Sequence, residues 1–286
     1  MGKYTICYDN QADAAVLTGG NWQATYPRDA LKDYRLKKTA RSTNALAAST
    51  VVRFALPAEV YVEALSLPGT NASPDATYRY RLFSDATFTT ISYDSGVVTL
   101  FPAGSMPNSQ IPAGAPNAGT GKPLRAQVQR FQCNMTHLLT APLHARWGEL
   151  QVNDAANPDG YFEAGRLFIG RVFQPDYPPA YGTLERRLTS RSEVVKARDG
   201  TPYFNKQRPE FCLPVAFRHL SQDESLQALE LQAIVDVVGD AIAIEDPTDA
   251  TYWWMRQVFG QLKALDPIAF PRFAEYETSF QVEGTL

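Results

Sequence analysis

Short apolar segments that end at glycine, proline, asparagine or aspartate dominate the first 220 residues of this chain. Residues 51–56 end at Pro57, and residues 60–67 end at a Pro-Gly pair. Residues 77–83 alternate polar and apolar side chains, which is the period of a half-buried strand. Strands are also predicted over residues 124–131 and 192–196, with a hairpin turn at residues 198–201. Many short strands at this spacing predict a mainly β protein with a sandwich or jelly roll in its N-terminal part.

Two proline-containing stretches interrupt the pattern of short strands. Residues 102–123 are rich in Pro, Gly, Ala and Asn and have almost no large apolar side chains. We expect them to form an exposed loop, because they cannot bury enough apolar surface to hold a fixed place in a core. The pair Pro178-Pro179 marks the predicted boundary between a domain over residues 1–176 and a second domain over residues 177–286.

The second domain contains the one strong helix signal of the sequence, at about residues 221–238. Ser221 can cap this helix with its hydroxyl, and Glu224 can reach back to complete a capping box. Apolar residues then recur at helical spacing until Gly239 ends the helix. These residues are Leu226, Leu229, Ala233, Ile234 and Val237. Strands are expected after the helix, including one over residues 252–258, so this part is predicted to be a β-rich α+β domain.

Residues 157–160, Asn-Pro-Asp-Gly, are a strong turn sequence. The alternative is a calcium site, whose ligands would be Asp154, Asn157, Asp159 and Glu163. A calcium loop of the EF type aligned on this turn would need ligands at Ala155 and Arg166, and neither side chain can serve. We therefore predict a plain turn and no metal site.

Motifs give no positive sign of an enzyme. The sequence has no G-x-S-x-G stretch, and its three histidines, His137, His144 and His219, are too scattered for a zinc pair on one helix. We predict no catalytic residue and no cofactor. A hydrolase whose pair of acids meets only in the fold stays open as an alternative.

The overall charge and the cysteines restrict the partners and the cellular compartment expected for the protein. A formal net charge of -3 gives no general attraction to nucleic acid or to an anionic membrane. The sequence has no apolar run long enough to span a membrane, and its first ten residues lack the apolar centre of a signal peptide. Cys7, Cys133 and Cys212 are far apart and odd in number, so we expect reduced, mostly buried thiols in a protein made in a cytoplasm.

Two groups of residues are candidates for an interface with partners. A strand through Trp253 and Trp254 would turn these two indoles to opposite faces. Either one indole faces the core and the other the surface or a partner, or both faces belong to the core. Arg186 and Arg187 begin a basic zone in the second domain. This zone is either a solvated strand face or, in a ring of copies, a surface that faces DNA.

Three stretches resemble tail proteins of long-tailed, non-contractile bacteriophages, especially the adaptor-like minor tail proteins at the tail tip. The first is NWQATYPRDAL at residues 21–31, followed by Arg-Ser-Thr at 41–43. The second is NPDGYFEAGRLFIG at 157–170, and the third is the capped helix with the strands that follow it. The resemblance implies a galactose-binding-like jelly roll, followed by a domain similar to the ring-forming β domain of distal tail proteins.

Arg166 and Arg171 belong to the second of these stretches or follow it directly. Because they are five residues apart, a regular strand would point them to opposite faces, and one of them could brace the neighbouring domain. The flanking Gly165 and Gly170 are expected to allow close backbone approach at strand ends.

The resemblance implies a structural protein of the virion that is assembled in the host cytoplasm and located at the tail tip. It implies a homo-oligomeric ring of six copies that joins the tail tube protein to the baseplate hub protein. DNA or a tape-measure protein is a candidate for contact in the lumen of the ring. The alternative function is that of a carbohydrate-binding module that recognises a glycan of the host surface.

Overall fold

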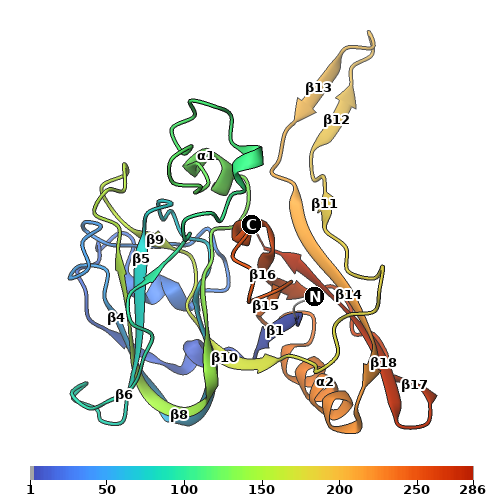
Figure 1. Ribbon diagram of the computed structural model, residues 1–286. Helices are drawn as coiled ribbons and strands as arrows, with labels where there is room; N and C mark the ends of the chain where they lie inside the picture. The colour runs from blue at the N-terminus through green and yellow to red at the C-terminus, as the bar shows by residue number, and fades with distance from the viewer. Residues whose placement is uncertain (1–2, 286) are drawn as a thin grey trace.

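The computed structural model describes residues 3–285, and it contains two β-rich halves that lie side by side (Figure 1). The first half is a β-sandwich. Its strands are β2 (Val16–Thr18), β3 (Ala40–Arg41), β4 (Val52–Leu67), β5 (Thr77–Phe83), β6 (Ile91–Asp94), β7 (Val98–Thr99), β8 (Met135–Asn153), β9 (Glu163–Ala164) and β10 (Phe168–Phe173). Short helices lie between them, namely η1 (Gln11–Ala14), η2 (Arg28–Lys32), η3 (Asn108–Gln110) and α1 (Arg125–Val128).

Two long strands organise the sandwich. β4 pairs with β8, and β8 pairs on its other edge with β5. The sequence predicted two strands separated by Pro57, whereas β4 is a single strand of 16 residues. Pro57 is tolerated because it lies between the pairs Ala55–Trp147 and Val60–Ala145, where the register with β8 shifts.

The second half is a sheet with a helix packed on one face. Its strands are β1 (Thr5–Tyr8), β11 (Arg187–Thr189), β14 (Glu210–Leu220), β15 (Ala241–Ile244), β16 (Gln257–Leu262), β17 (Ala269–Arg272) and β18 (Glu275–Gly284). The helix is α2 (Gln222–Val235), which begins after Ser221 with both hydrogen bonds of the predicted capping box. α2 buries Ala228, Leu231 and Val235 in the core of this half.

One continuous sheet runs through both halves, in the order β11-β14-β18-β16-β15-β1-β10-β4-β8-β5-β6. β1 lies between β15 and β10, and Tyr4, Ile6 and Tyr8 are buried in the core of the second half. The N-terminal strand therefore does not follow the predicted division into residues 1–176 and 177–286. The physical reason is that an open sheet edge can be completed by an extended segment from any part of the chain.

Two segments predicted as strands are short helical turns. Residues 124–131 contain α1, whose first turn is fixed by a hydrogen bond of 2.8 Å from Leu124 N to Gln127 Oε1. Residues 252–258 begin with the turn η4 (Trp253–Met255), and the strand starts only at Gln257. The backbone of Tyr252 has a φ of 54°, which interrupts an extended conformation.

The loop at residues 102–123 is held more firmly than its composition suggested. Met106 and Asn117 are buried, and the Asn117 side chain donates a hydrogen bond of 2.7 Å to Lys122 O. Ser105 O accepts a hydrogen bond of 2.8 Å from Tyr252 N. A loop with few large side chains can thus be anchored by polar contacts, and its outer turns remain exposed.

The predicted fold class is confirmed: the chain is mainly β, with a jelly-roll sandwich and a β-rich second half that contains one long helix. The three cysteines are free and buried, as predicted. Within residues 3–285, no helix has the length and apolar character needed to cross a membrane.

Candidate functional site

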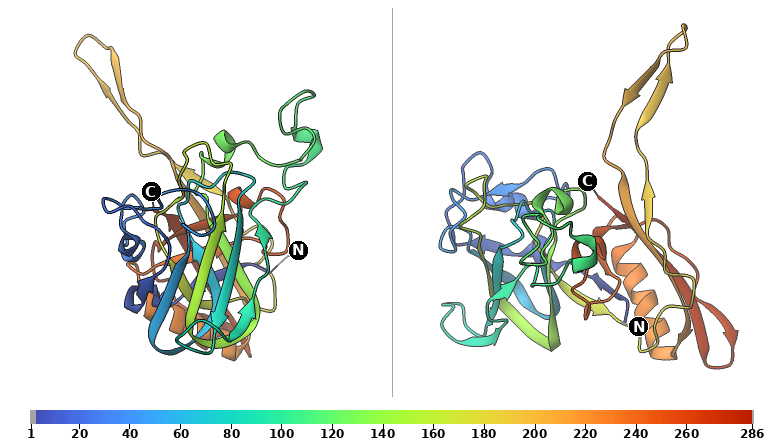
Figure 2. Two further views of the ribbon diagram at one scale, coloured as in Figure 1. Left: turned by 90° about the vertical axis from the view of Figure 1, so that its left-hand side faces the viewer. Right: turned by 45° about the horizontal axis from the view of Figure 1, so that its top comes forward.

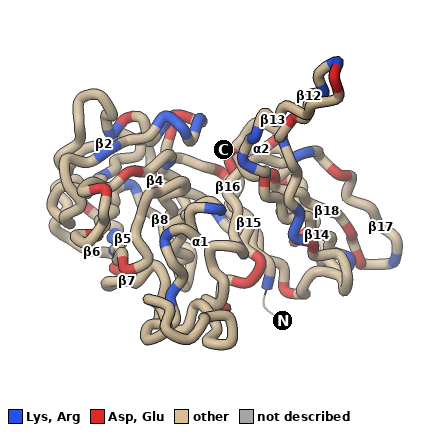
Figure 3. The backbone as a smooth tube through the Cα atoms, turned by 90° about the horizontal axis from the view of Figure 1, so that it is seen from above, with Lys and Arg blue, Asp and Glu red and all other residues tan. Residues whose placement is uncertain are grey.

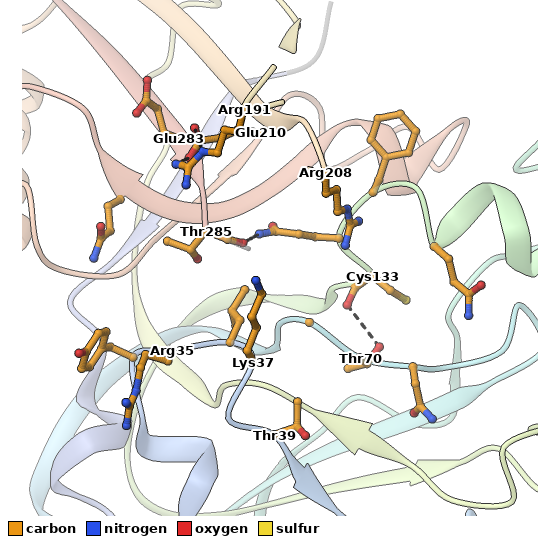
Figure 4. A pocket seen from close by; sticks show the side chains of 18 of the residues that line it. Arg35, Lys37, Thr39, Thr70, Cys133, Arg191, Arg208, Glu210, Glu283 and Thr285 are labelled. Atoms are coloured by element: carbon orange, nitrogen blue, oxygen red, sulfur yellow. Dashed lines mark hydrogen bonds and ion pairs between the residues drawn. The ribbon is translucent and has the colours of Figure 1, made fainter. Parts of the chain in front are cut away.

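A cleft of about 1180 Å³ lies between the sandwich and the second half (Figure 4). Residues 34–39 and 69–72 form its wall on the sandwich side. The opposite wall contains the ends of β16 and β18 and the segment around Arg208, at the base of a projecting hairpin. The cleft is therefore assembled from segments that are far apart in sequence.

The cleft is lined by five cationic and three acidic side chains. Arg191 is paired with Glu210, and Lys263 is paired with Glu283 at 2.8 Å. Within residues 3–285, Lys37 and Arg208 have no carboxylate within 4.0 Å. Lys37 comes from the sandwich and Arg208 from the base of the hairpin, and Figure 4 shows both side chains at the cleft. Two cations without acidic partners favour an anionic ligand.

Desolvation lowers the pKa of Arg208, although its side chain is exposed overall. The floor of the cleft is formed by Gln132, whose side-chain amide exchanges two hydrogen bonds with Phe259, at 3.0 Å to the carbonyl and 2.9 Å from the N–H. Beside it, burial raises the pKa of the Cys133 thiol to about 11. Cys133 is therefore a neutral thiol at pH 7 and not an activated nucleophile.

A cage of aromatic side chains stiffens the sandwich wall of the cleft. The guanidinium of Arg41 lies 4.2 Å from the ring centres of both Tyr26 and Tyr161. Its NH2 group is 3.1 Å from Glu163 Oε2, and Glu163 also accepts a hydrogen bond from Thr39. Cation–π stacking on two faces fixes the arginine, so this wall is preorganised.

Arg166 joins the sandwich to the second half. Its side chain is buried and is held by Asp240 at 2.5 Å and by Asp13 at 2.7 Å. Burial alone would lower the pKa of Arg166, but the hydrogen bond with Asp13 and the charge of Asp240 raise it overall. Arg166 thus connects the two halves within one chain.

Arg166 lies before β10 and therefore shares no strand with Arg171. Arg171 points elsewhere. It is 2.7 Å from Glu230 on α2, and its guanidinium lies 5.3 Å from the Tyr8 ring centre. The glycines on either side of this stretch have the expected close contacts. A Cβ at Gly165 would lie 2.7 Å from Leu36 O, and one at Gly170 would lie 2.3 Å from Tyr8 O.

The tryptophan pair does not form the predicted partner surface. Trp254 is only 3% exposed and packs edge to face against Phe101, with ring centres 5.6 Å apart. Trp253 is partly buried against two of the cores. The prediction that one indole would face a partner rested on a strand, and the helical turn η4 replaces that strand.

The basic zone is largely neutralised within the chain. Arg186 makes two hydrogen bonds to Glu245, at 2.7 and 2.5 Å, and Arg187 lies 3.2 Å from Glu185. Figure 3 shows cationic and acidic residues interspersed along the backbone. Contact of this zone with DNA stays a prediction.

Asp154, in the acidic stretch before the turn at 157–160, holds this turn against Ser73 through hydrogen bonds. Asp154 is buried and accepts hydrogen bonds from the Ser73 N–H at 2.8 Å and from the Asn157 side chain at 2.7 Å. Gly160 N donates to Asn157 O at 2.9 Å, which closes the predicted turn. The carboxylate is thus occupied by protein donors.

A long hairpin projects from the second half, away from both cores (Figure 2). We call it the arm and define it as residues 193–206; its strands are β12 (Glu193–Lys196) and β13 (Pro202–Asn205). The turn predicted at residues 198–201 is present, closed by Gly200 N donating to Ala197 O at 2.9 Å. Four large side chains of the arm are 57–70% exposed. They are Val194, Val195, Tyr203 and Phe204.

The outer side of α2 is a second exposed apolar surface. Leu226 is 56% exposed and Leu229 is 53% exposed, and Val237 beyond the helix end is also exposed. These residues belong to the apolar series that predicted the helix, but they are not its buried face. The helix has apolar residues on two sides, because Ala228 and Leu231 fill the core.

Neither the cleft nor the exposure of the arm was predicted from the sequence, although the turn of the arm was. Lys37 and Arg208 belong to different halves, so no local pattern could have joined them. The arm had a usable signal: adjacent apolar pairs on each side of a turn, Val194-Val195 and Tyr203-Phe204, place one apolar residue of each pair on each face of a hairpin. A hairpin that is apolar on both faces cannot be covered by one core.

No protein-family model and no curated protein matches the chain. Similar solved structures include a family 32 carbohydrate-binding module of NanJ from C. perfringens, in complex with galactose. It is 9% identical, covers 58% of this chain and 99% of that chain, and has a TM-score of 0.37. The family 32 module of AlyQ, in complex with 4,5-unsaturated mannuronic acid, is 14% identical over 57% of this chain and 96% of that chain, with a TM-score of 0.33.

A fucolectin from the serum of Morone saxatilis, the striped bass, is 12% identical and covers 97% of this chain and 90% of that chain, with a TM-score of 0.37. At these identities and TM-scores, what the three proteins bind says nothing about this chain.

Proposed function

We propose that this chain is a structural assembly protein, which joins further copies and neighbouring proteins through exposed apolar surfaces. The observation that supports the proposal most directly is the arm, whose Val194, Val195, Tyr203 and Phe204 are exposed on a hairpin without a core of its own. Isolated two-stranded hairpins are marginally stable in water, and exposed apolar patches are typical of protein interfaces. Burial against a partner would supply the missing contacts.

The tip of a second hairpin, between β17 and β18, has the same character. Phe273 is 94% exposed there, and Phe270 on β17 is 56% exposed. Two projecting apolar hairpins on one half favour several contacts per copy. Such contacts between different surfaces generate closed rings or filaments.

In its finer form the proposal follows the resemblance to phage tail proteins. The second half would form a ring of six copies at the tail tip, between the tail tube protein and the baseplate hub protein. The sandwich would lie on the outside of the ring. Electron microscopy of the particle tests this form, since density for a closed ring of this chain at the tail end is the expected result.

Replacing Phe204 and Tyr203 by threonine is expected to weaken self-association at least about tenfold, because each buried aromatic residue at an interface contributes about 1–2 kcal/mol. Threonine keeps a high strand propensity, so the hairpin itself should persist. Sedimentation velocity across a wide range of concentrations measures the change.

The matched control is Tyr181→Thr, which removes an aromatic residue that is 96% exposed but lies outside the arm. It should associate as the natural chain does. Equal association of the natural chain and the arm variant, in sedimentation and in particle incorporation, would contradict the proposal.

A second candidate function is recognition of an anionic carbohydrate in the cleft. The observation that favours it is the pair Lys37 and Arg208, which line an open cleft without a carboxylate within 4.0 Å among residues 3–285. A charged sugar would supply that carboxylate, and the caged Arg41 next to Glu163 keeps the sandwich wall rigid. A preorganised wall lowers the entropic cost of binding.

We expect oligogalacturonate to bind the natural protein saturably, and Lys37→Met and Arg208→Met each to lower its affinity about tenfold, through loss of one charge-assisted hydrogen bond. Isothermal titration calorimetry measures the affinity. Arg272→Met, which removes a cation outside the cleft, is the control and should bind as the natural chain does. A neutral oligosaccharide that binds equally well would exclude this second function.

A further inference from the structure

The exposed side of α2 has the features of an acceptor surface. Leu226 and Leu229 are three residues apart and Ala233 follows four residues later, so the three residues share one side of the helix. All three are exposed, whereas Ala228, Leu231 and Val235 face the core. The side of α2 turned away from its own sheet therefore carries an exposed apolar row, which lies beside the exposed Asp223 and Glu230.

The arm is complementary to this surface in apolar character and in net charge. Val194 lies opposite Phe204 in the hairpin ladder, and Val195 lies opposite Tyr203, so each face of the arm presents one aliphatic and one aromatic residue. The arm has three cationic and two acidic residues. α2 has three acidic residues, Asp223, Glu224 and Glu230, and no cationic residue. Glu230 is already paired with Arg171, whereas Asp223 and Glu224 in the first turn have no cationic partner among residues 3–285. The net negative charge at this end of the helix complements the positive net charge of the arm.

The arm and α2 lie at opposite ends of the second half, with the arm at the top and α2 at the bottom of Figure 1. The right-hand view of Figure 2 also shows the arm extending away from α2. The arm of one copy is therefore directed away from the helix of the same copy. A contact between the two surfaces joins different copies, and repetition of that contact leads head to tail from copy to copy.

We propose that the arm of one copy docks on the exposed side of α2 of a second copy, and that this contact is the unit by which the chain assembles. The inference rests on the proposed assembly function and specifies its partner: a second copy of this chain, bound through Leu226, Leu229 and Ala233. The contact is heterologous, because each copy offers a donor arm and an acceptor helix that are different surfaces.

A mixing experiment with two variants of the full-length chain tests the assignment. In the arm variant, the four exposed residues Val194, Val195, Tyr203 and Phe204 are replaced by threonine. In the helix variant, Leu226 and Leu229 are replaced by glutamine, which keeps a high helix propensity. Circular dichroism and thermal unfolding of each variant establish that both fold as the natural chain does.

Each variant alone is expected to lose the oligomer seen for the natural chain in light scattering. An equimolar mixture is expected to form a heterodimer and nothing larger. In the mixture, the intact arm of the helix variant can dock on the intact α2 of the arm variant. The other arm and the other helix carry the substitutions, so no third chain can bind.

The other outcomes separate the inference from the proposed function. If the helix variant assembles like the natural chain while the arm variant does not, the arm binds another surface, so the inference is wrong and the assembly function stands. If the mixture stays monomeric although both variants fold, the arm does not dock on α2, and the inference is again overturned. If the natural chain and the arm variant are equally monomeric at every concentration, both the inference and its premise fail.

Discussion

Replacing Arg166 by methionine is expected to destabilise the protein by about 3–5 kcal/mol, because removal of one member of a buried ion pair leaves an uncompensated charge. The charge concerned is that of Asp240, whose side chain is 7% exposed. Without Arg166, the Asp240 carboxylate keeps the hydrogen bond of 2.8 Å that the Asn10 side chain donates to it. Denaturant unfolding followed by circular dichroism measures the loss, as a lower midpoint at an unchanged slope.

A double variant shows whether the cost arises from the orphaned carboxylate. Asp240→Asn removes that charge, so the double variant R166M/D240N should recover a large part of the stability lost in R166M. Asp13 is 59% exposed and can be solvated by water, so Asp13→Asn should restore little. Equal recovery by both second substitutions would contradict this explanation.

Arg166 also affects the cleft, because it holds the sandwich against the second half. Its NH1 group donates to Lys32 O, at the end of η2, and the wall of the cleft begins two residues later. R166M should therefore loosen the wall at Tyr34–Thr39 as well as lower global stability. Relative to the natural chain, the rate of hydrogen exchange should therefore rise in this segment and stay unchanged in the arm.

Replacing Gly260 by alanine is expected to cost at least about 3 kcal/mol, at or beyond the upper end of the usual range for overpacked positions. A Cβ at Gly260 would lie 1.7 Å from Glu283 O and 2.9 Å from Gly284 Cα. Both atoms are backbone atoms of β18, so no side-chain rotation can relieve the clash. β16 and β18 must separate, which breaks the ladder that joins Gly260 to Gly284.

Gly119→Ala is the matched control for this substitution, since nothing lies within 4 Å of its added Cβ. It should change the free energy of unfolding by less than about 0.5 kcal/mol. Thermal unfolding of both variants gives the comparison. A small effect of Gly260→Ala, equal to that of the control, would show that the two strands can part without loss of the core.

The disruption of the β16–β18 pairing in Gly260→Ala should extend to the cleft. Gln261 and Glu283 neighbour the clash, and both line the cleft. The end of α2 should also be affected, because the Gln261 side chain donates a hydrogen bond of 3.0 Å to Val238 O, just beyond the helix.

Local features of the fold could be predicted from the sequence because a few neighbouring residues determine them. Ser221 and Glu224 form the capping box within one turn of helix. The Asn-Pro-Asp-Gly turn is closed by a hydrogen bond within residues 157–160. The likeness to phage tail proteins, by contrast, stays a prediction.

The tertiary structure alone decided which surfaces are exposed and which residues meet. The apolar spacing in residues 222–235 predicted a helix. Packing against the sheet then buried Ala228 and Leu231 and left Leu226 and Leu229 exposed. Likewise, Trp254 became a core residue because η4 turned it toward Phe101. Burial depends on which segments pack together, and periodicity along one segment does not contain that information.

The sequence by itself thus determined a mainly β chain with its turns, its helix cap and its close-packed glycines. Only the tertiary structure placed β1 beside β15, brought Lys37 and Arg208 to one cleft and extended the arm beyond the core. The physical reason is the range of the interactions. Caps and turns act over three or four residues, whereas the pairing of β1 with β15 and the cleft join residues that are more than a hundred positions apart.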